Sequence, residues 1–126
     1  MILAILQSRM ASPRLPGKAL ASLHGEPLVY RQIERIARAR HVQRVVVATS
    51  IEPQDDPLAA FLVSRGKAVF RGAPRDLLAR FLACAESAGA PSHVVRLKGD
   101  AAFIDPGIID ATLECLGEHV PKHLRG

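Results

Sequence analysis

The segment from Gln7 to Lys18 carries residue types that could bind a polyphosphate. It reads QSRMASPRLPGK and places three cations, Arg9, Arg14 and Lys18, within ten residues. Arginine binds phosphate oxygens through a two-pronged set of N–H donors, and lysine adds a compact positive charge. Two prolines and a glycine limit the conformations of this backbone. The segment therefore predicts a basic loop that holds the phosphates of a nucleoside triphosphate.

The same segment lacks the glycine-rich motifs of other nucleotide-binding proteins. In a P-loop the Gly-Lys pair is followed by Ser or Thr, but Gly17-Lys18 is followed by Ala19, and the earlier glycine of the motif is absent. No G-x-G-x-x-G follows the first apolar run, which argues against a Rossmann dinucleotide site. Ser12 has no evident base to activate it, so hydrolase chemistry is not indicated.

The elements that must position this loop alternate between strand and helix. Short apolar runs predict buried strands of a parallel sheet at residues 2–6, 45–48, 68–70 and 94–97. Helical patterns begin near Pro27, Asp55, Pro74 and Asp105, and Gly66 and Gly89 end the second and third of them. Asp55-Asp56 before Pro57 is the predicted cap of the second helix. The third pattern is expected to bury five apolar side chains, those of Leu77, Leu78, Phe81, Ala85 and Ala88.

This alternation predicts the fold class. We expect residues 1–126 to form one nucleotide-binding α/β domain, with helices on both faces of a mostly parallel, Rossmann-like sheet in three α/β/α layers. Ligands of such sheets bind at the carboxyl ends of the strands, near the point where the strand order reverses. The basic segment directly follows the first predicted strand, which favours a ligand-binding role over a merely solvated loop.

Positive charge is concentrated in the first part of the chain. Residues 1–50 contain eight Lys or Arg against two Asp or Glu, whereas residues 51–126 contain nine against ten. This asymmetry favours an anionic partner, such as a nucleotide, an acidic sugar or a nucleic acid. Arg31, Arg35 and Arg38 form a stripe on the first predicted helix that could follow a nucleic-acid backbone, but such a row is more often a solvated face. We therefore expect no nucleic-acid partner.

Membrane, secretory and zinc-binding classes are not indicated. No apolar run approaches the roughly 18 residues of a membrane span, and residues 1–6 lack the positive flank of a signal peptide. Cys84 and Cys115 match no zinc or redox motif, which predicts reduced core thiols in a cytoplasmic protein. Cys115, His119 and His123 are spaced by fours, but Pro121 interrupts their helix, so we interpret them as incidental rather than as a zinc site.

Four segments, taken in order, resemble the cytidylyltransferase group that includes the spore coat polysaccharide biosynthesis protein F family and the acylneuraminate and 3-deoxy-manno-octulosonate (KDO) cytidylyltransferases. The family patterns are A-R-x-G-S-x-R-L-P-x-K, A-T-S/T with D-D, F-R-G with L-D-R-[FY], and V-R-x-x-G-D-x-P-x-I-D-P. The corresponding segments read SRMASPRLPGK at 8–18, VATS with DD at 47–56, FRG with LARF at 70–81, and VRLKGD with IDP at 95–106.

The resemblance implies a nucleotide-diphospho-sugar transferase-like fold and a sugar-activating reaction. Such enzymes transfer CMP from CTP to an acidic or other sugar for surface polysaccharide biosynthesis, and pyrophosphate leaves with the assistance of Mg²⁺. The implied catalytic residues are Arg9, Lys18 and Asp100, with Asp100 as the magnesium ligand. The implied nucleotide-binding residues are Gln7, Arg9, Ser12, Arg14, Lys18, Thr49, Ser50, Arg71 and Asp100.

Several features depart from the family. The replaced positions are Ala11 for a glycine, Pro13 for Ser or Thr, Ala79 for Asp, and Ala101-Ala102 for the pair after Gly-Asp. Family members also continue well beyond the position of Asp110, so we expect a truncated fold whose exposed sheet edge or apolar patch is covered in a homodimer. Two functions stay open: a cytidylyltransferase, and a non-catalytic nucleotide-binding or interaction domain that kept the fold and lost turnover.

Overall fold

The computed structural model of the chain describes residues 2–11, 17–89, 91, 93–99 and 104–111. Its described strands form a four-stranded parallel sheet in the order β5-β4-β1-β6. These strands are β1 (Ile2–Gln7), β4 (Arg44–Ser50), β5 (Val69–Gly72) and β6 (His93–Lys98). The predicted strands are confirmed, because each lies within or beside one of these ranges.

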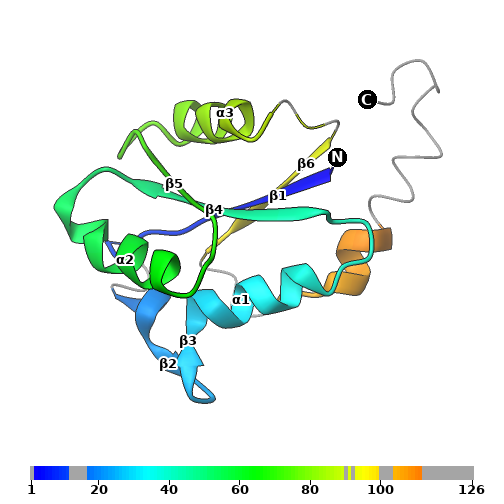
Figure 1. Cartoon of the computed structure of the whole chain (residues 1–126), viewed down its shortest axis with the longest axis horizontal. Helices are drawn as coiled ribbons and strands as arrows, with labels where there is room; N and C mark the ends of the chain where they lie inside the picture. The colour runs from blue at the N-terminus through cyan, green and yellow to red at the C-terminus, as the bar shows by residue number, and fades with distance from the viewer. Residues whose placement is uncertain (1, 12–16, 90, 92, 100–103, 112–126) are drawn as a thin grey trace.

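Helices cover both faces of the sheet (Figure 1). Helices α1 (Leu28–Ala37) and α2 (Asp56–Ser64) lie on one face, and α3 (Leu77–Ser87) lies on the other. Short 3-10 turns, η1 (Lys18–Leu20) and η2 (Pro53–Asp55), follow β1 and β4, and residues 106–111 are helical again. The three-layer α/β/α arrangement predicted from the alternation of patterns is therefore confirmed.

Alternating side chains of β1 build one apolar layer on each face of the sheet. Ala4 and Leu6 pack with side chains of α1 and α2, whereas Leu3 and Ile5 pack with Cys84 of α3. All of these residues are almost fully buried. A central strand that is covered on both faces must be apolar throughout. This explains why β1 is a continuous run of apolar residues and does not alternate between apolar and polar ones.

The start of α3 differs from the prediction. The helix begins at Leu77 rather than near Pro74, because Asp76 caps it. The Asp76 side chain accepts a hydrogen bond of 2.9 Å from the backbone N–H of Ala79. An aspartate in this position satisfies one of the free N–H groups of the first turn, so it fixes the start of the helix.

The buried face of α3 was also predicted wrongly in part. Leu78 is 64% exposed and Leu77 is 48% exposed, whereas Arg80 and Cys84 are buried. Apolar residues occur on more than one side of this helix, so their spacing alone did not identify the face that meets the sheet. The packed face instead includes a charged side chain that an apolar pattern cannot predict.

A small hairpin precedes α1. It pairs β2 (Ser22–Leu23) with β3 (Glu26–Pro27). Between them, His24 and Gly25 have φ values of 52° and 88°, as a type I′ turn requires. Arg31 of α1 donates hydrogen bonds to the carbonyl oxygens of Leu23 and His24, at 3.2 and 2.6 Å. Part of the basic stripe therefore holds the hairpin against α1.

The described helices include none with the length and apolar character needed to cross a membrane.

Candidate functional site

The carboxyl ends of β1 and β6 frame a cavity of about 260 Å³. The chain runs outward from β1 through β4 to β5 and then returns to place β6 on the other side of β1. The cavity therefore lies where the strand order reverses, which is where open α/β sheets bind their ligands. Its polar lining consists of Gln7, Ser8, Arg9, Lys18, Arg80, Arg96 and Lys98.

Five of the described lining residues are basic and none is acidic. They come from four separate segments: the loop after β1, the turn η1, helix α3 and strand β6. Cations that converge on one concave surface raise the local concentration of anions and offer several donors to the oxygens of a single ligand. The electrostatics of the cavity therefore fit a polyphosphate.

Two of these cations share a face of β6. Arg96 and Lys98 are two residues apart, so their side chains point to the same side of the sheet. They stand beside Ile5 and Gln7 of β1 in the parallel register. The guanidinium carbon of Arg96 also lies 6.0 Å from the ring centre of Phe81 in α3. These cations therefore lie on the face of the sheet that α3 covers.

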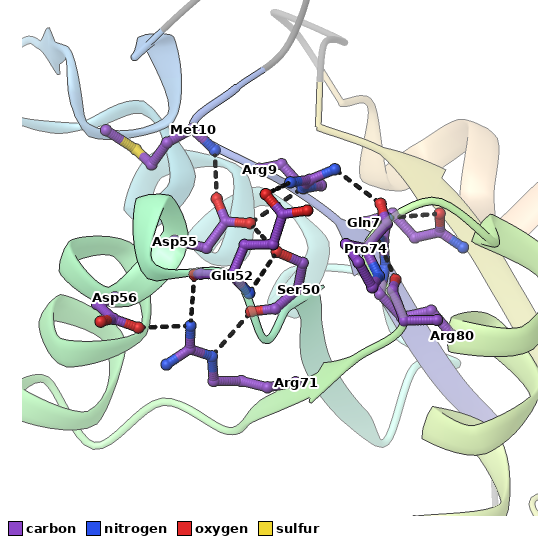
Figure 2. Close-up of polar contacts among 11 residues, drawn as sticks. Gln7, Arg9, Met10, Ser50, Glu52, Asp55, Asp56, Arg71, Pro74 and Arg80 are labelled. Carbon is purple, nitrogen blue, oxygen red and sulfur yellow. Dashed lines mark hydrogen bonds and ion pairs between the residues drawn. The ribbon is translucent and has the colours of Figure 1, made fainter.

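A buried carboxylate organises the loops beside the cavity (Figure 2). Asp55 accepts hydrogen bonds from the backbone N–H of Met10 at 2.8 Å, from Nε of Arg9 at 3.0 Å and from the hydroxyl of Ser50. The sequence predicted a helix cap at this position, yet the Asp55 side chain makes no capping bond to α2. Asp55 instead joins the loop after β1 to the loop after β4.

The environment of Asp55 favours its ionised form. Burial raises the pKa of this carboxyl, but hydrogen bonds from Ser50, Met10 and Arg9 outweigh burial and lower the pKa below the ordinary value of 3.8. Asp55 is therefore negatively charged at neutral pH and neutralises the adjacent Arg9.

Arg9 connects three loops at this edge of the sheet. Besides Asp55, its Nη1 donates to the carbonyl oxygen of Pro74 at 2.7 Å, and its Nη2 lies 3.5 Å from Glu52. Pro74 belongs to the loop after β5, and Glu52 to the loop after β4. Figure 2 shows these contacts, which hold the guanidinium in one orientation. Arg9 also lines the cavity.

The end of β6 approaches the end of β1 so closely that only glycine fits. The N–H of Gly99 donates to the carbonyl oxygen of Gln7 at 2.7 Å. A Cβ atom on Gly99 would lie 2.7 Å from that same oxygen and 3.0 Å from Cβ of Ser8. This contact forms the floor of the cavity and explains the glycine of the G-D segment.

The structure brings together part of the predicted site. Gln7, Arg9 and Lys18 all line the cavity. The predicted residues Ser12, Arg14 and Asp100 lie outside the described residues, as do Ala101-Ala102 and the Cys115–His123 segment.

Three other predicted residues do not line this cavity. Thr49 is fully buried, and it shares a face of β4 with Val47, which packs with side chains of α1 and α2 on the face away from α3. Ser50 is bonded to Asp55. Arg71 donates to the carbonyl oxygen of Ser50 at 2.9 Å and to Asp56 at 2.7 Å. Ser50 and Arg71 thus support the loop after β4 in this structure.

Four residues with polar side chains that line the cavity were missing from the predicted set: Ser8, Arg80, Arg96 and Lys98. All four lie in the segments that carry the family resemblance, and the alternation along β6 could have placed Arg96 and Lys98 on one face. Arg80 matches the arginine of the L-D-R-[FY] pattern, so that segment was the signal that could have identified it. Gly72 makes room for it, because a Cβ on Gly72 would lie 3.2 Å from Cγ of Arg80.

Comparison with known proteins identifies the family. A family model described as cytidylyltransferase matches residues 3–123. The spore coat polysaccharide biosynthesis protein SpsF of Bacillus subtilis is 38% identical over 117 residues, which are 90% of this chain and 48% of that protein. The 3-deoxy-manno-octulosonate cytidylyltransferase of Geobacter sulfurreducens is 38% identical over 119 residues, which are 94% of this chain and 46% of that protein. The chain spans about half the length of the curated relatives it matches.

Solved structures agree with the sequence relatives. A cytidylyltransferase from Leptospira borgpetersenii is 31% identical, has a TM-score of 0.86, and is matched over 94% of this chain and 49% of that one. CMP:2-keto-3-deoxy-manno-octonic acid synthetase, solved in complex with CTP, shares the fold with a TM-score of 0.75 at 24% identity. The resemblance inferred from four ordered segments is thereby confirmed, and the chain belongs to the cytidylyltransferase family.

Proposed function

We propose that this chain is the nucleotide-binding part of a sugar-activating cytidylyltransferase, and that its basic cavity holds the phosphates of CTP. The observation that carries the proposal is the convergence of Arg9, Lys18, Arg80, Arg96 and Lys98 on one cavity at the point where the strand order reverses. No described acidic residue lines the cavity, so a ligand with several negative charges is the best match.

The proposed reaction transfers CMP to a sugar. A sugar hydroxyl attacks the α-phosphorus of CTP, a new P–O bond forms, the bond to the leaving pyrophosphate breaks, and the hydroxyl proton passes to water. Negative charge builds up on the pyrophosphate, so fixed cations lower the barrier chiefly by positioning and electrostatic stabilisation. Arg9 and Lys18 supply this stabilisation in our proposal, and Arg9 is already oriented by Asp55.

Further residues of the loop are assigned to the same site as part of the proposal. Ser12 and Arg14 belong to the basic segment that begins with Gln7 and Arg9 and ends with Lys18, residues that all line the cavity. Ser50 and Arg71 support the loop after β4, in which Asp55 orients Arg9, and Thr49 directly precedes Ser50 at the end of that strand. We therefore assign these three residues to nucleotide binding through the shape of that loop.

Asp100 is the proposed ligand of Mg²⁺. The described residues contain no cluster of His, Cys, Asp and Glu that could hold a metal. Asp100 follows Gly99, which lines the cavity, and one carboxylate together with phosphate oxygens and water is a usual magnesium environment. When bound, Mg²⁺ would neutralise charge on the phosphate oxygens.

The names of the relatives support an acidic sugar as the acceptor. Several relatives are 3-deoxy-manno-octulosonate cytidylyltransferases, and SpsF is a spore coat polysaccharide biosynthesis protein. We propose that the product serves surface polysaccharide synthesis in the cytoplasm. We also propose a homodimer, supported by the exposed Leu78 and Leu82 on α3, and sedimentation velocity tests it.

The experiment that tests the function is pyrophosphate release from CTP with a panel of acidic sugars that includes KDO. We expect release that depends on the sugar and on Mg²⁺, and none from Lys18→Ala. Nucleotide binding without release from any sugar would instead select a non-catalytic domain that kept the fold.

A further inference from the structure

Arg80 is a buried cation without a described anionic partner. Its side chain is almost fully enclosed, at 1% exposure, although it borders the cavity. Nη1 donates to the carbonyl oxygens of Ala73 at 3.0 Å and Pro74 at 3.5 Å, and Nη2 lies 3.5 Å from Oε1 of Gln7. Nε has no partner at all in the described structure. Every acceptor around this guanidinium is therefore neutral.

The nearest ionic neighbour makes the position of Arg80 less favourable. Arg9 donates to the same Pro74 carbonyl oxygen, at 2.7 Å, so two positive charges meet at one neutral acceptor. Burial is the main cause that lowers the pKa of Arg80, and the positive charge of Arg9 lowers it further. The negative charge of Asp55 raises this pKa but offsets only part of the decrease. Asp55 itself is bonded to Arg9. A buried charge of this kind is costly unless an anion pairs with it.

A structural role for Arg80 explains only part of this arrangement. The carbonyl groups of Ala73 and Pro74 need hydrogen-bond donors, but a neutral donor would serve them without the cost of a buried charge. The neighbouring Gln7 also has an unsatisfied donor, because its Nε2 is buried and has no hydrogen-bond partner among the described residues. Two adjacent residues of the cavity lining, Gln7 and Arg80, therefore each hold a buried donor that no described residue satisfies.

We propose that Arg80 is an anion-binding residue of this cavity, which with the amide of Gln7 takes an oxygen of the phosphate tail of the nucleotide. The inference rests on the proposed function for the identity of the anion. A bound phosphate oxygen supplies the missing counter-charge beside Arg80 and Arg9, both of which line the cavity.

Two substitutions separate the charge of Arg80 from its hydrogen bonds. Arg80→Gln keeps a donor for the loop carbonyls and removes the charge, whereas Arg80→Lys keeps both. Arg44→Gln, at an exposed position at the amino end of β4, is the matched control. Affinity for CTP with Mg²⁺ and for inorganic tripolyphosphate is measured by calorimetry, and thermal unfolding checks that each variant is folded.

We expect Arg80→Gln to weaken both ligands by about tenfold to a hundredfold, Arg80→Lys to weaken them less, and Arg44→Gln to match the wild type. Two results would contradict the proposed contact between Arg80 and a phosphate oxygen. One is equal affinity of the wild type and Arg80→Gln for both ligands. The other is weaker binding of CTP without weaker binding of tripolyphosphate. Should neither Arg80 variant fold, the Nε–H signal of Arg80 in wild-type NMR spectra decides, since it must shift as tripolyphosphate is added. A signal that does not move contradicts the proposal.

The two proposals fail in different ways. If Lys18→Ala abolishes CTP binding and Arg80→Gln leaves it intact, the proposed function stands and the role of Arg80 is wrong. If the wild type binds tripolyphosphate through Arg80 but does not bind CTP, the role of Arg80 stands and the nucleotide assignment is wrong.

Discussion

The carboxylate of Asp55 accepts a hydrogen bond of 3.0 Å from Nε of Arg9, although the two residues are 46 positions apart in the sequence. Asp55 is fully buried where α2 begins, and Arg9 follows β1. The first cation of the basic loop is therefore oriented by a residue of another segment. Because of this ion pair, the shape of the cavity edge depends on the contact between the loop after β1 and the loop after β4.

The substitution Asp55→Asn is expected to destabilise the fold by about 2 kcal/mol at neutral pH, because it removes the charge that neutralises Arg9 and disturbs several hydrogen bonds. Urea denaturation measures the loss. Asp56→Asn is the matched control, because Asp56 is largely exposed and its pair with Arg71 contributes little. Equal losses from the two substitutions would show that the buried pair does not hold the loops.

The contribution of Asp55 also depends on pH in a defined direction. The pKa of Asp55 in the folded chain lies below its ordinary value of 3.8, so the ionised carboxylate stabilises the folded state fully above that value. The stabilisation is lost as the pH falls below 3.8 and through the lower folded pKa. The difference in unfolding free energy between wild type and Asp55→Asn should therefore shrink in acid, and a constant difference would contradict this account.

Gly99→Ala is expected to lower the unfolding free energy by about 2 kcal/mol and to weaken CTP binding, because the added Cβ would overlap the backbone of β1. The predicted contact is 2.7 Å to the carbonyl oxygen of Gln7. Gly107→Ala is the control, since its Cβ would meet only the end of the Asp105 side chain. Both variants are compared by urea denaturation and calorimetry, and a fully stable Gly99→Ala would refute the close approach.

Cys84 is expected to be unreactive in the folded protein. Burial raises the pKa of its thiol to about 11, so almost none of the reactive thiolate exists near neutral pH, and reagents cannot reach it. The measurement is the rate of labelling with a thiol reagent in a Cys115→Ser variant, in which Cys84 is the single cysteine. Labelling should become fast only after denaturation, and fast labelling of the native chain would be inconsistent with the buried position.

Local patterns were sufficient to predict the layers of this fold. The apolar run of β1 and the glycine that ends α2 depend on neighbours in the sequence, so both were predicted correctly. The described ends of the basic loop, residues 7–11 and 17–18, lie at the carboxyl edge of the sheet, as expected for a loop that follows a parallel strand. Gln7, Arg9 and Lys18 consequently line the cavity as expected.

The role of Asp55 and the buried face of α3 depend on contacts between distant residues, which local sequence patterns do not predict. The sequence predicted that Asp55 would cap a helix, but its side chain binds Arg9 from a distant loop. The helical pattern predicted that Leu78 would be buried, but the Asp76 cap and the packing on the sheet place Arg80 inside instead. Both errors have one cause: a charged group became buried through a tertiary contact.

The most direct test of the central claim is calorimetric titration of CTP with Mg²⁺ into the wild-type chain, Lys18→Ala and Lys67→Ala. Lys18 lines the cavity, whereas Lys67 lies before β5 at the opposite edge of the sheet, so both variants lose one lysine charge at different ends. We predict that Lys18→Ala weakens binding by about tenfold or more and that Lys67→Ala binds as the wild type does. Equal affinities in all three proteins, or no heat from the wild type, would contradict the assignment of this cavity to the nucleotide phosphates.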